Sequence, residues 1–77
     1  PPEAGLMRWS PERLDQLERA IRDGRRVAVS RRGNEHIVIA TRLTTRGSRE
    51  AFVGRLPMTG EELLFVLEEV DAFQVVS

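Results

Sequence analysis

The stretch Arg25–Leu43, RRVAVSRRGNEHIVIATRL, decides the fold. On both sides of the dipeptide Gly33-Asn34, apolar and polar residues alternate in segments rich in β-branched side chains. Such alternation is typical of strands with one buried face, and a Gly-Asn pair between two strand patterns indicates a two-residue hairpin turn. The stretch therefore predicts two antiparallel strands, RRVAVSRR and EHIVIATRL, joined by a turn at Gly33-Asn34.

A third strand pattern, REAFVGRL at residues 49–56, follows a second turn signal, TTRGS. Alternation gives the resulting three-stranded meander two faces. The face expected to be buried carries Val27, Val29, Ile37, Ile39, Leu43, Phe52 and Leu56. The opposite face, here named the arginine-fringed face, has small residues at its centre and arginines at its ends: Arg26, Ala28, Ser30, Arg32, His36, Val38, Ala40, Arg42, Arg49, Ala51, Val53 and Arg55.

The segment before the meander, WSPERLDQLERAIRDG at residues 9–24, predicts an amphipathic helix over about residues 10–23. Ser10 is placed to cap this helix, Pro11 suits its first position, and Gly24 provides a left-handed stop. Trp9 stands where a hydrophobic staple residue is expected. An apolar stripe follows at helical spacing, made of Leu14, Leu17, Ala20 and Ile21. Because such a stripe must be buried, we expect the helix to pack on the sheet.

Two structures are open for residues 60–70. Thr59 and Glu62 match a capping box, and the apolar residues that follow have helical spacing, so local signals favour a helix. The apolar run LLFVL, bounded by Pro57 and Gly60, is also consistent with a fully buried strand. In that case AFQVV forms a short closing strand after a turn at EEVD.

Length and composition predict one globular domain over residues 1–77, with residues 1–8 flexible and a strand region at about 25–76. The absence of cysteine excludes disulfides and favours a reducing, cytoplasmic environment, and no apolar run approaches the length of a membrane span. The chain has one histidine, no phosphate-binding glycine loop and no nucleophile motif. We therefore expect no catalytic activity, no cofactor and no metal.

Charge is unevenly distributed along a chain whose formal net charge is zero. Residues 25–56 carry eight arginines against Glu35 and Glu50, a net charge of +6, whereas residues 57–77 contain five acids and no arginine, a net charge of −5. The two blocks either neutralise each other within the fold or take part in electrostatic recognition of a partner.

The order of elements resembles the WYL domain, a small Sm-like β-barrel of bacterial transcriptional regulators. The similarity runs over roughly residues 14–76 and rests on LERAIRDGRRVAVSRRG, HIVIATRL and AFVGRLPMTGEELLFVLEEVDAFQVV. The Trp-Tyr-Leu triplet of the family would fall on Ala51, Phe52 and Val53, so the apolar scaffold carries the resemblance. It implies an α+β fold, with an N-terminal helix packed on a small, strongly bent antiparallel sheet or Sm-like barrel of four to five strands. It also favours a strand at Leu63–Leu67.

WYL domains are thought to bind nucleic acid or nucleotide-like ligands, so the resemblance implies a non-catalytic regulatory or recognition module. The candidate binding residues belong to the arginine-fringed face: Arg26, Arg32, Arg42, Arg49, Arg55 and His36. The alternative is a protein-interaction or homo-oligomerisation module that uses an exposed sheet edge and the two opposite charge blocks. No membrane partner is expected.

Overall fold

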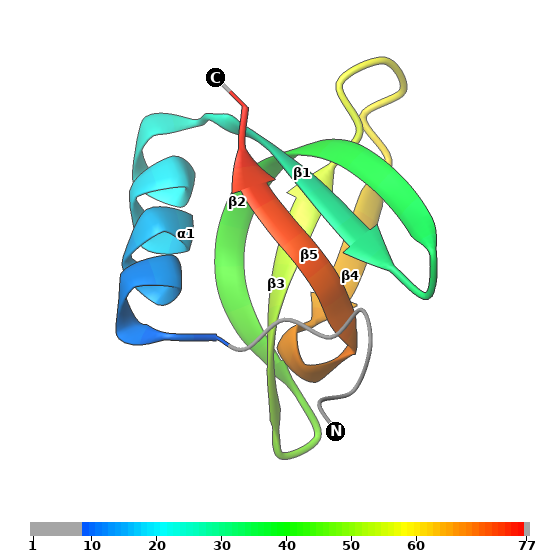
Figure 1. The fold of residues 1–77 in the computed structure, drawn as a ribbon. Coiled ribbons are helices and arrows are strands. Elements are labelled where there is room, and N and C mark those ends of the chain that lie inside the picture. The colour runs from blue at the N-terminus through cyan, green and yellow to red at the C-terminus, as the bar shows by residue number, and fades with distance from the viewer. Residues whose placement is uncertain (1–8, 77) are drawn as a thin grey trace.

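In the computed structural model, which describes residues 9–76, one helix packs on a five-stranded antiparallel sheet (Figure 1). The strand order is β4-β3-β2-β1-β5. The elements are α1 (Pro11–Asp23), β1 (Arg26–Arg31), β2 (Asn34–Arg46), β3 (Arg49–Arg55), β4 (Glu62–Val66), the 3-10 helix η1 (Leu67–Glu69) and β5 (Val70–Val75). The predicted α+β class is confirmed. The long strand β2 curves strongly, but over the described residues the sheet does not close into a barrel.

Helix α1 begins and ends where its sequence predicts. The Ser10 side chain accepts a hydrogen bond from the Arg13 backbone N–H at 3.2 Å, and Pro11 is the first helical residue. Gly24 ends the helix in the left-handed conformation at φ 67°, which glycine adopts without steric cost. Leu17 and Ala20 are buried against the sheet, and Leu14 and Ile21 pack beside them. The sheet therefore covers the predicted stripe.

The turn between β1 and β2 lies one residue earlier than predicted. Arg31 pairs with Asn34, so the two turn residues are Arg32 and Gly33 instead of Gly33 and Asn34. Both have positive φ, 53° for Arg32 and 81° for Gly33. Left-handed conformations at both turn positions match the twist of the flanking strands, which explains why this hairpin forms.

The predicted faces of the first half of β2 were wrong for a separate reason. Cross-strand partners lie on the same face, and with either turn the partners of Val27 and Val29 are even-numbered residues of β2. Val38 pairs with Val27 and is fully buried, and Ala40 is buried as well. Ile37, predicted to be in the core, is 42% exposed, and Ile39 is half-buried on the outer side. The prediction that Ile37 and Ile39 are buried while Val38 and Ala40 face solvent was wrong.

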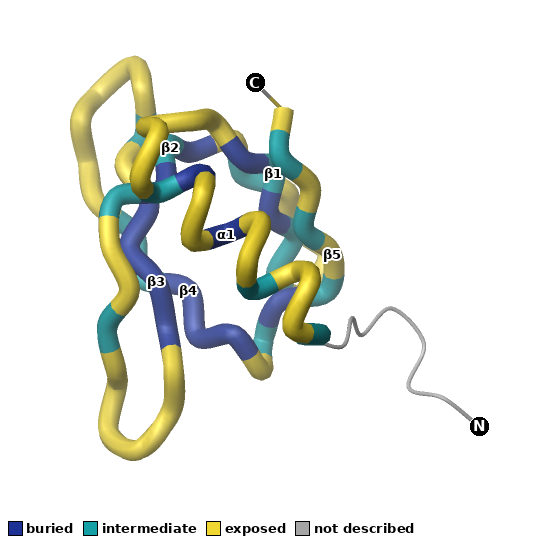
Figure 2. Tube along the Cα trace, turned by 90° about the vertical axis from the view of Figure 1, so that its left-hand side faces the viewer, coloured by how far each residue is buried: buried dark blue, intermediate teal, exposed yellow. Residues whose placement is uncertain are grey.

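An irregularity at Thr41 changes the alternation again. The pairing of β2 with β3 shifts between Ala40 and Arg42, and the Thr41 hydroxyl donates a hydrogen bond to the Val53 carbonyl at 3.0 Å. Beyond this bulge Leu43 pairs with Phe52, on the inner side as predicted. Leu43 nevertheless remains 45% exposed, because the β2–β3 hairpin projects beyond the core (Figure 2).

Two phenylalanines form the centre of the core. Phe52 on β3 pairs with Phe65 on β4, both are fully buried, and their rings stack with centroids 5.1 Å apart. Val27 and Val29 are also fully buried, as predicted. The same buried cluster contains Leu17, Ala20, Val38, Ala40, Leu67 and Val70, and Ala51, Val53 and Val66 are buried as well.

The segment left open by the sequence forms two strands. Residues 62–66 are β4, η1 makes the turn, and residues 70–75 are β5, so the helix favoured by local signals is wrong. The Thr59 hydroxyl, expected to cap that helix, accepts a hydrogen bond from the Glu61 N–H within the β3–β4 turn. Pairing of β4 with β3 overrides the local helical spacing.

Trp9 fixes the start of α1 to the far end of the chain. Its indole Nε1–H donates to the Leu67 carbonyl at 2.8 Å, and its ring lies 5.1 Å from that of Phe73. The prediction that residues 1–8 are flexible lies outside the described residues. No helix in residues 9–76 is long and apolar enough to cross a membrane.

Candidate functional site

The structure divides the six predicted binding residues between two regions. Three of them, Arg26, Arg42 and Arg55, lie on the outer face of the sheet. Arg26 on β1 and Arg55 on β3 both pair with Ile39 on β2. Arg26, Ile39 and Arg55 therefore form a row across the three strands. Arg42 lies beyond the bulge and forms an ion pair with Glu62, with 3.6 Å between Nη1 and Oε2.

The other arginines of the set meet the acidic C-terminal block. Arg32 and Arg49 both approach the same carboxylate oxygen of Glu69, at 3.6 and 3.5 Å. Arg49 also pairs with Glu68 at 3.3 Å. The opposite charge blocks of the sequence are therefore partly neutralised within the fold.

His36 does not lie on the solvated face where the sequence places it. With the turn at Arg32-Gly33, His36 pairs with Val29 and shares the inner side of the sheet. Its ring is half-buried beside Phe65, with 5.6 Å between the ring centroids. His36 is thus part of the wall at one end of the core.

Arg31, which was not among the predicted residues, is the most firmly held arginine near this end of the core. Its guanidinium carbon lies 4.9 Å from the Phe65 ring centroid, and Nη1 donates to the Leu64 carbonyl at 2.7 Å. The signal was present in the sequence: alternation from Val27 and Val29 puts Arg31 on the buried side, at the end of the strand. An arginine at that position places a cation at the end of the inner row formed by Val27 and Val29, and its contacts with Phe65 and Leu64 hold it there.

Arg31, Arg32 and His36 surround one cavity of about 510 Å³, here named the basic basin. Its lining residues are Arg31, Arg32, Asn34, His36, Arg46, Leu64, Val66 and Glu69. The charged side chains of the lining are thus three arginines and one carboxylate. The basin joins the β1–β2 hairpin, the far end of β2, β4 and η1, and this long-range assembly is not visible in the local sequence pattern.

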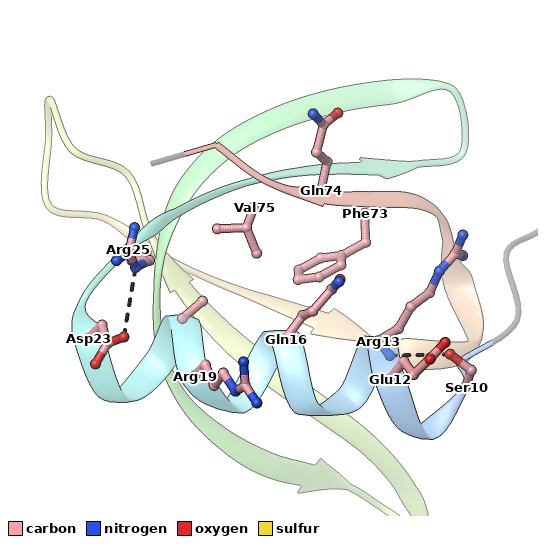
Figure 3. A pocket seen from close by; sticks show the side chains of 11 residues that line it. Ser10, Glu12, Arg13, Gln16, Arg19, Asp23, Arg25, Phe73, Gln74 and Val75 are labelled. Carbon is pink, nitrogen blue, oxygen red and sulfur yellow. Dashed lines mark hydrogen bonds and ion pairs between the residues drawn. The ribbon is translucent and has the colours of Figure 1, made fainter.

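A larger groove of about 680 Å³ runs between α1 and β5 (Figure 3). Phe73 and Val75 point from β5 toward the helix, while charged side chains of both signs line the helix side. Two of its arginines are already paired, Arg19 with Asp15 at 3.0 Å and Arg25 with Asp23 at 3.7 Å. This groove therefore has no dominant charge, unlike the basic basin.

The aromatic residues offer little surface for stacking of nucleobases. Phe52 and Phe65 are fully buried, and Trp9 and Phe73 are half-buried and contact each other. Within residues 9–76, no three histidine, aspartate or glutamate side chains are grouped so that they could hold a metal ion. The chemistry of the basin is therefore that of arginine with a neighbouring imidazole.

Comparisons of the chain with protein-family models, with curated proteins and with solved structures give no match.

Proposed function

We propose that the protein is a non-catalytic recognition module that binds the phosphate groups of a nucleic acid or nucleotide in the basic basin. One observation carries the proposal: Arg31 is held in place by Phe65 and Leu64 at a cavity that Arg32, Arg46 and His36 also line. The resemblance to the WYL domain, a regulatory module thought to take such ligands, supports the same ligand class.

The hydrogen-bond donors and the restricted side chain of Arg31 favour an anionic ligand. A guanidinium has five N–H donors, and one hydrogen bond to Leu64 leaves the others for a second acceptor. Because stacking and this hydrogen bond already restrict the side chain, little rotamer freedom is lost when a ligand binds. Phosphate oxygens suit such a planar donor group, which can hold two of them at once.

The backbone at Arg32 also favours a binding role. Non-glycine residues rarely have positive φ, and the left-handed conformation costs an L-residue about 1–2 kcal/mol. The exposed ion pair of Arg32 with Glu69 returns about 0–1 kcal/mol at most. Arginine is thus a poor residue for the stability of this turn, and a role in contacting ligand accounts for its presence.

Fluorescence anisotropy with labelled single- and double-stranded oligonucleotides tests the proposal. Binding should weaken steeply as salt rises from about 50 mM, because phosphate contacts release counterions. Unlabelled nucleoside triphosphate should compete if a single nucleotide suffices. Absence of binding at about 50 mM salt would remove the proposal.

A matched pair of double variants locates the site. Arg31→Gln with Arg46→Gln removes two charges from the basin, and Arg26→Gln with Arg55→Gln removes two from the outer face. The first pair should abolish most of the affinity and the second should leave it nearly unchanged. Equal losses would contradict a basin site and would favour the outer face.

A protein partner on the outer face is the second candidate. Ile37 is 42% exposed there, and Ile39 lies in a row between Arg26 and Arg55. An apolar centre with a charged rim is typical of protein interfaces. Sedimentation velocity over a range of concentrations tests self-association. Replacement of Ile37 by lysine should abolish any dimer that buries this row.

A further inference from the structure

A third cavity, of about 360 Å³, lies between α1 and the β2–β3 hairpin and shares no lining residue with the basic basin. We name it the α1–hairpin cleft. It is lined by Leu14, Glu18, Leu43, Thr44, Thr45, Glu50 and Leu67. The β2–β3 hairpin extends beyond the rest of the sheet (Figure 2), and the cleft lies where its residues 43–50 face α1.

Leucines from three elements form the apolar part of this cleft. Leu67 of η1 is buried, Leu14 of α1 is half-buried, and Leu43 of β2 is 45% exposed. Leu43 lies on the inner side, where it pairs with the fully buried Phe52. An apolar side chain that continues the row of the core but remains open to solvent favours contact with an apolar chain from outside.

Two carboxylates complete the lining. Thr45 and Glu50 are cross-strand partners just beyond Leu43, and Glu18 lies one helical turn after Leu14. Among residues 9–76, neither Glu18 nor Glu50 has an arginine or histidine nitrogen within 4.0 Å, and no arginine lines the cleft. The cleft therefore combines an apolar surface with two negative charges and no opposing cation.

We propose that the α1–hairpin cleft binds the side chain of a lysine or arginine presented by a partner protein. These side chains carry an aliphatic stem of about three to four carbons and a terminal cation, which match the leucines and the two carboxylates. A free amine would lose its translational freedom for the contacts of this small cleft alone. A side chain within a longer bound segment shares that entropic cost with the rest of the interface.

Chemical-shift mapping by NMR on the full chain tests the proposal with blocked amino acids. The probes are Nα-acetyl-lysine N-methylamide, its Nε-acetylated neutral form, and Nα-acetyl-norleucine N-methylamide. Lysine should perturb the amides of Leu43, Thr45 and Glu50, with an affinity about three- to tenfold above that of either neutral probe. Equal binding of charged and neutral probes, shifts confined to other regions, or no shifts at all would overturn the proposal.

Matched variants separate charge from apolar contact. Glu18→Gln with Glu50→Gln should abolish the preference for lysine, whereas Glu12→Gln with Glu35→Gln changes the net charge equally outside the cleft and should preserve it. Leu43→Ser should weaken lysine and norleucine probes alike. Since Leu43 is already 45% exposed, this variant should keep its amide dispersion and fold. Loss of the preference in the control pair, or tighter binding of free n-pentylamine than of blocked lysine, would contradict a side-chain site.

Discussion

Arg31 lies over the ring of Phe65, with its guanidinium carbon 4.9 Å from the ring centroid, and so joins the core to the basic basin. The same phenylalanine stacks on Phe52, and its ring centroid lies 5.6 Å from that of His36. Phe65 therefore supports Arg31 and His36, two of the basin side chains that would meet a phosphate. The position of these two side chains depends on core packing.

The variant Arg31→Lys should separate this geometry from charge alone. Lysine keeps the positive charge but lacks the planar donor group that stacks and holds two oxygens. We expect the free energy of unfolding to fall by about 1 kcal/mol through the weaker contact with Phe65. Affinity for an oligonucleotide should fall about tenfold, because bidentate contacts are lost. Urea unfolding and anisotropy measure the two effects.

The conservative control for this variant is Arg13→Lys on α1, whose guanidinium lies outside the basin. Arg13→Lys should change neither the free energy of unfolding nor the free energy of oligonucleotide binding by more than about 0.5 kcal/mol. Unchanged oligonucleotide affinity in Arg31→Lys would show that only the charge of Arg31 matters.

Replacement of Arg32 by asparagine should raise stability while it lowers affinity. Asn-Gly is the favoured pair for a turn with two left-handed residues, and Arg32 now occupies its first position at φ 53°. Relief of the backbone cost, less the exposed pair with Glu69, should increase the free energy of unfolding by up to about 1 kcal/mol. Binding of nucleic acid should weaken because a basin cation is lost.

A gain in stability together with a loss of affinity in Arg32→Asn is not expected if Arg32 has a structural role alone. Urea denaturation at fixed salt gives the stability, and anisotropy at the same salt gives the affinity. Glu69→Gln serves as the control, because it removes the ion pair without changing the turn backbone. A loss of stability in Arg32→Asn would show that the side chain, not the backbone, determines this turn.

Gly54→Ala should be strongly destabilising. A Cβ built on Gly54 meets the side chain of Val38 on β2 in a clash and approaches Phe65 Cε2 at 3.2 Å. Since both neighbours are fully buried, they have little space to move, and we expect a loss of about 2–3 kcal/mol. Thermal or urea unfolding measures it.

The double variant Gly54→Ala with Val38→Ala provides the check on this mechanism. It removes the Cγ2 methyl of Val38, the atom that the new Cβ would approach most closely, so its loss should be smaller than the sum of the two single losses. Strictly additive losses would mean that Val38 is not what opposes a side chain at position 54.

The sequence predicted the elements better than their register. The boundaries of α1 followed from Ser10, Pro11 and Gly24, whose effects are local. The turn depended on whether Arg32-Gly33 or Gly33-Asn34 takes the two left-handed positions, and residue preference alone favoured the wrong pair. The faces of β2 are a separate matter, because both turns give Val27 and Val29 even-numbered partners. Val38 and Ala40 accordingly lie inside, beside the two stacked phenylalanines and across from Gly54.

The candidate site was predicted only in part for the same reason. Alternation read within each strand separately placed His36 and Arg32 together on a solvated face, whereas pairing with Val29 puts His36 on the inner side. Their meeting with Arg46 and Glu69 requires the bend of β2 and the docking of η1, which bring distant segments together. No pattern within a single strand carries that information.

The assignment of the two faces of β2 is tested by two neighbouring alanine variants in this strand. Val38→Ala should cost about 2 kcal/mol of unfolding free energy, because a fully buried side chain loses its packing. Ile37→Ala removes more carbon atoms but from a side chain that is 42% exposed, and should cost less than about 1 kcal/mol. The order of the two losses is the discriminating result, since the faces predicted from alternation within β2, with Ile37 buried and Val38 exposed, would reverse it. Ile39→Ala, half-buried on the same side as Ile37, should fall between them. A larger loss for Ile37→Ala than for Val38→Ala would contradict the observed pairing of β1 with β2, and with it the position of His36 in the basin.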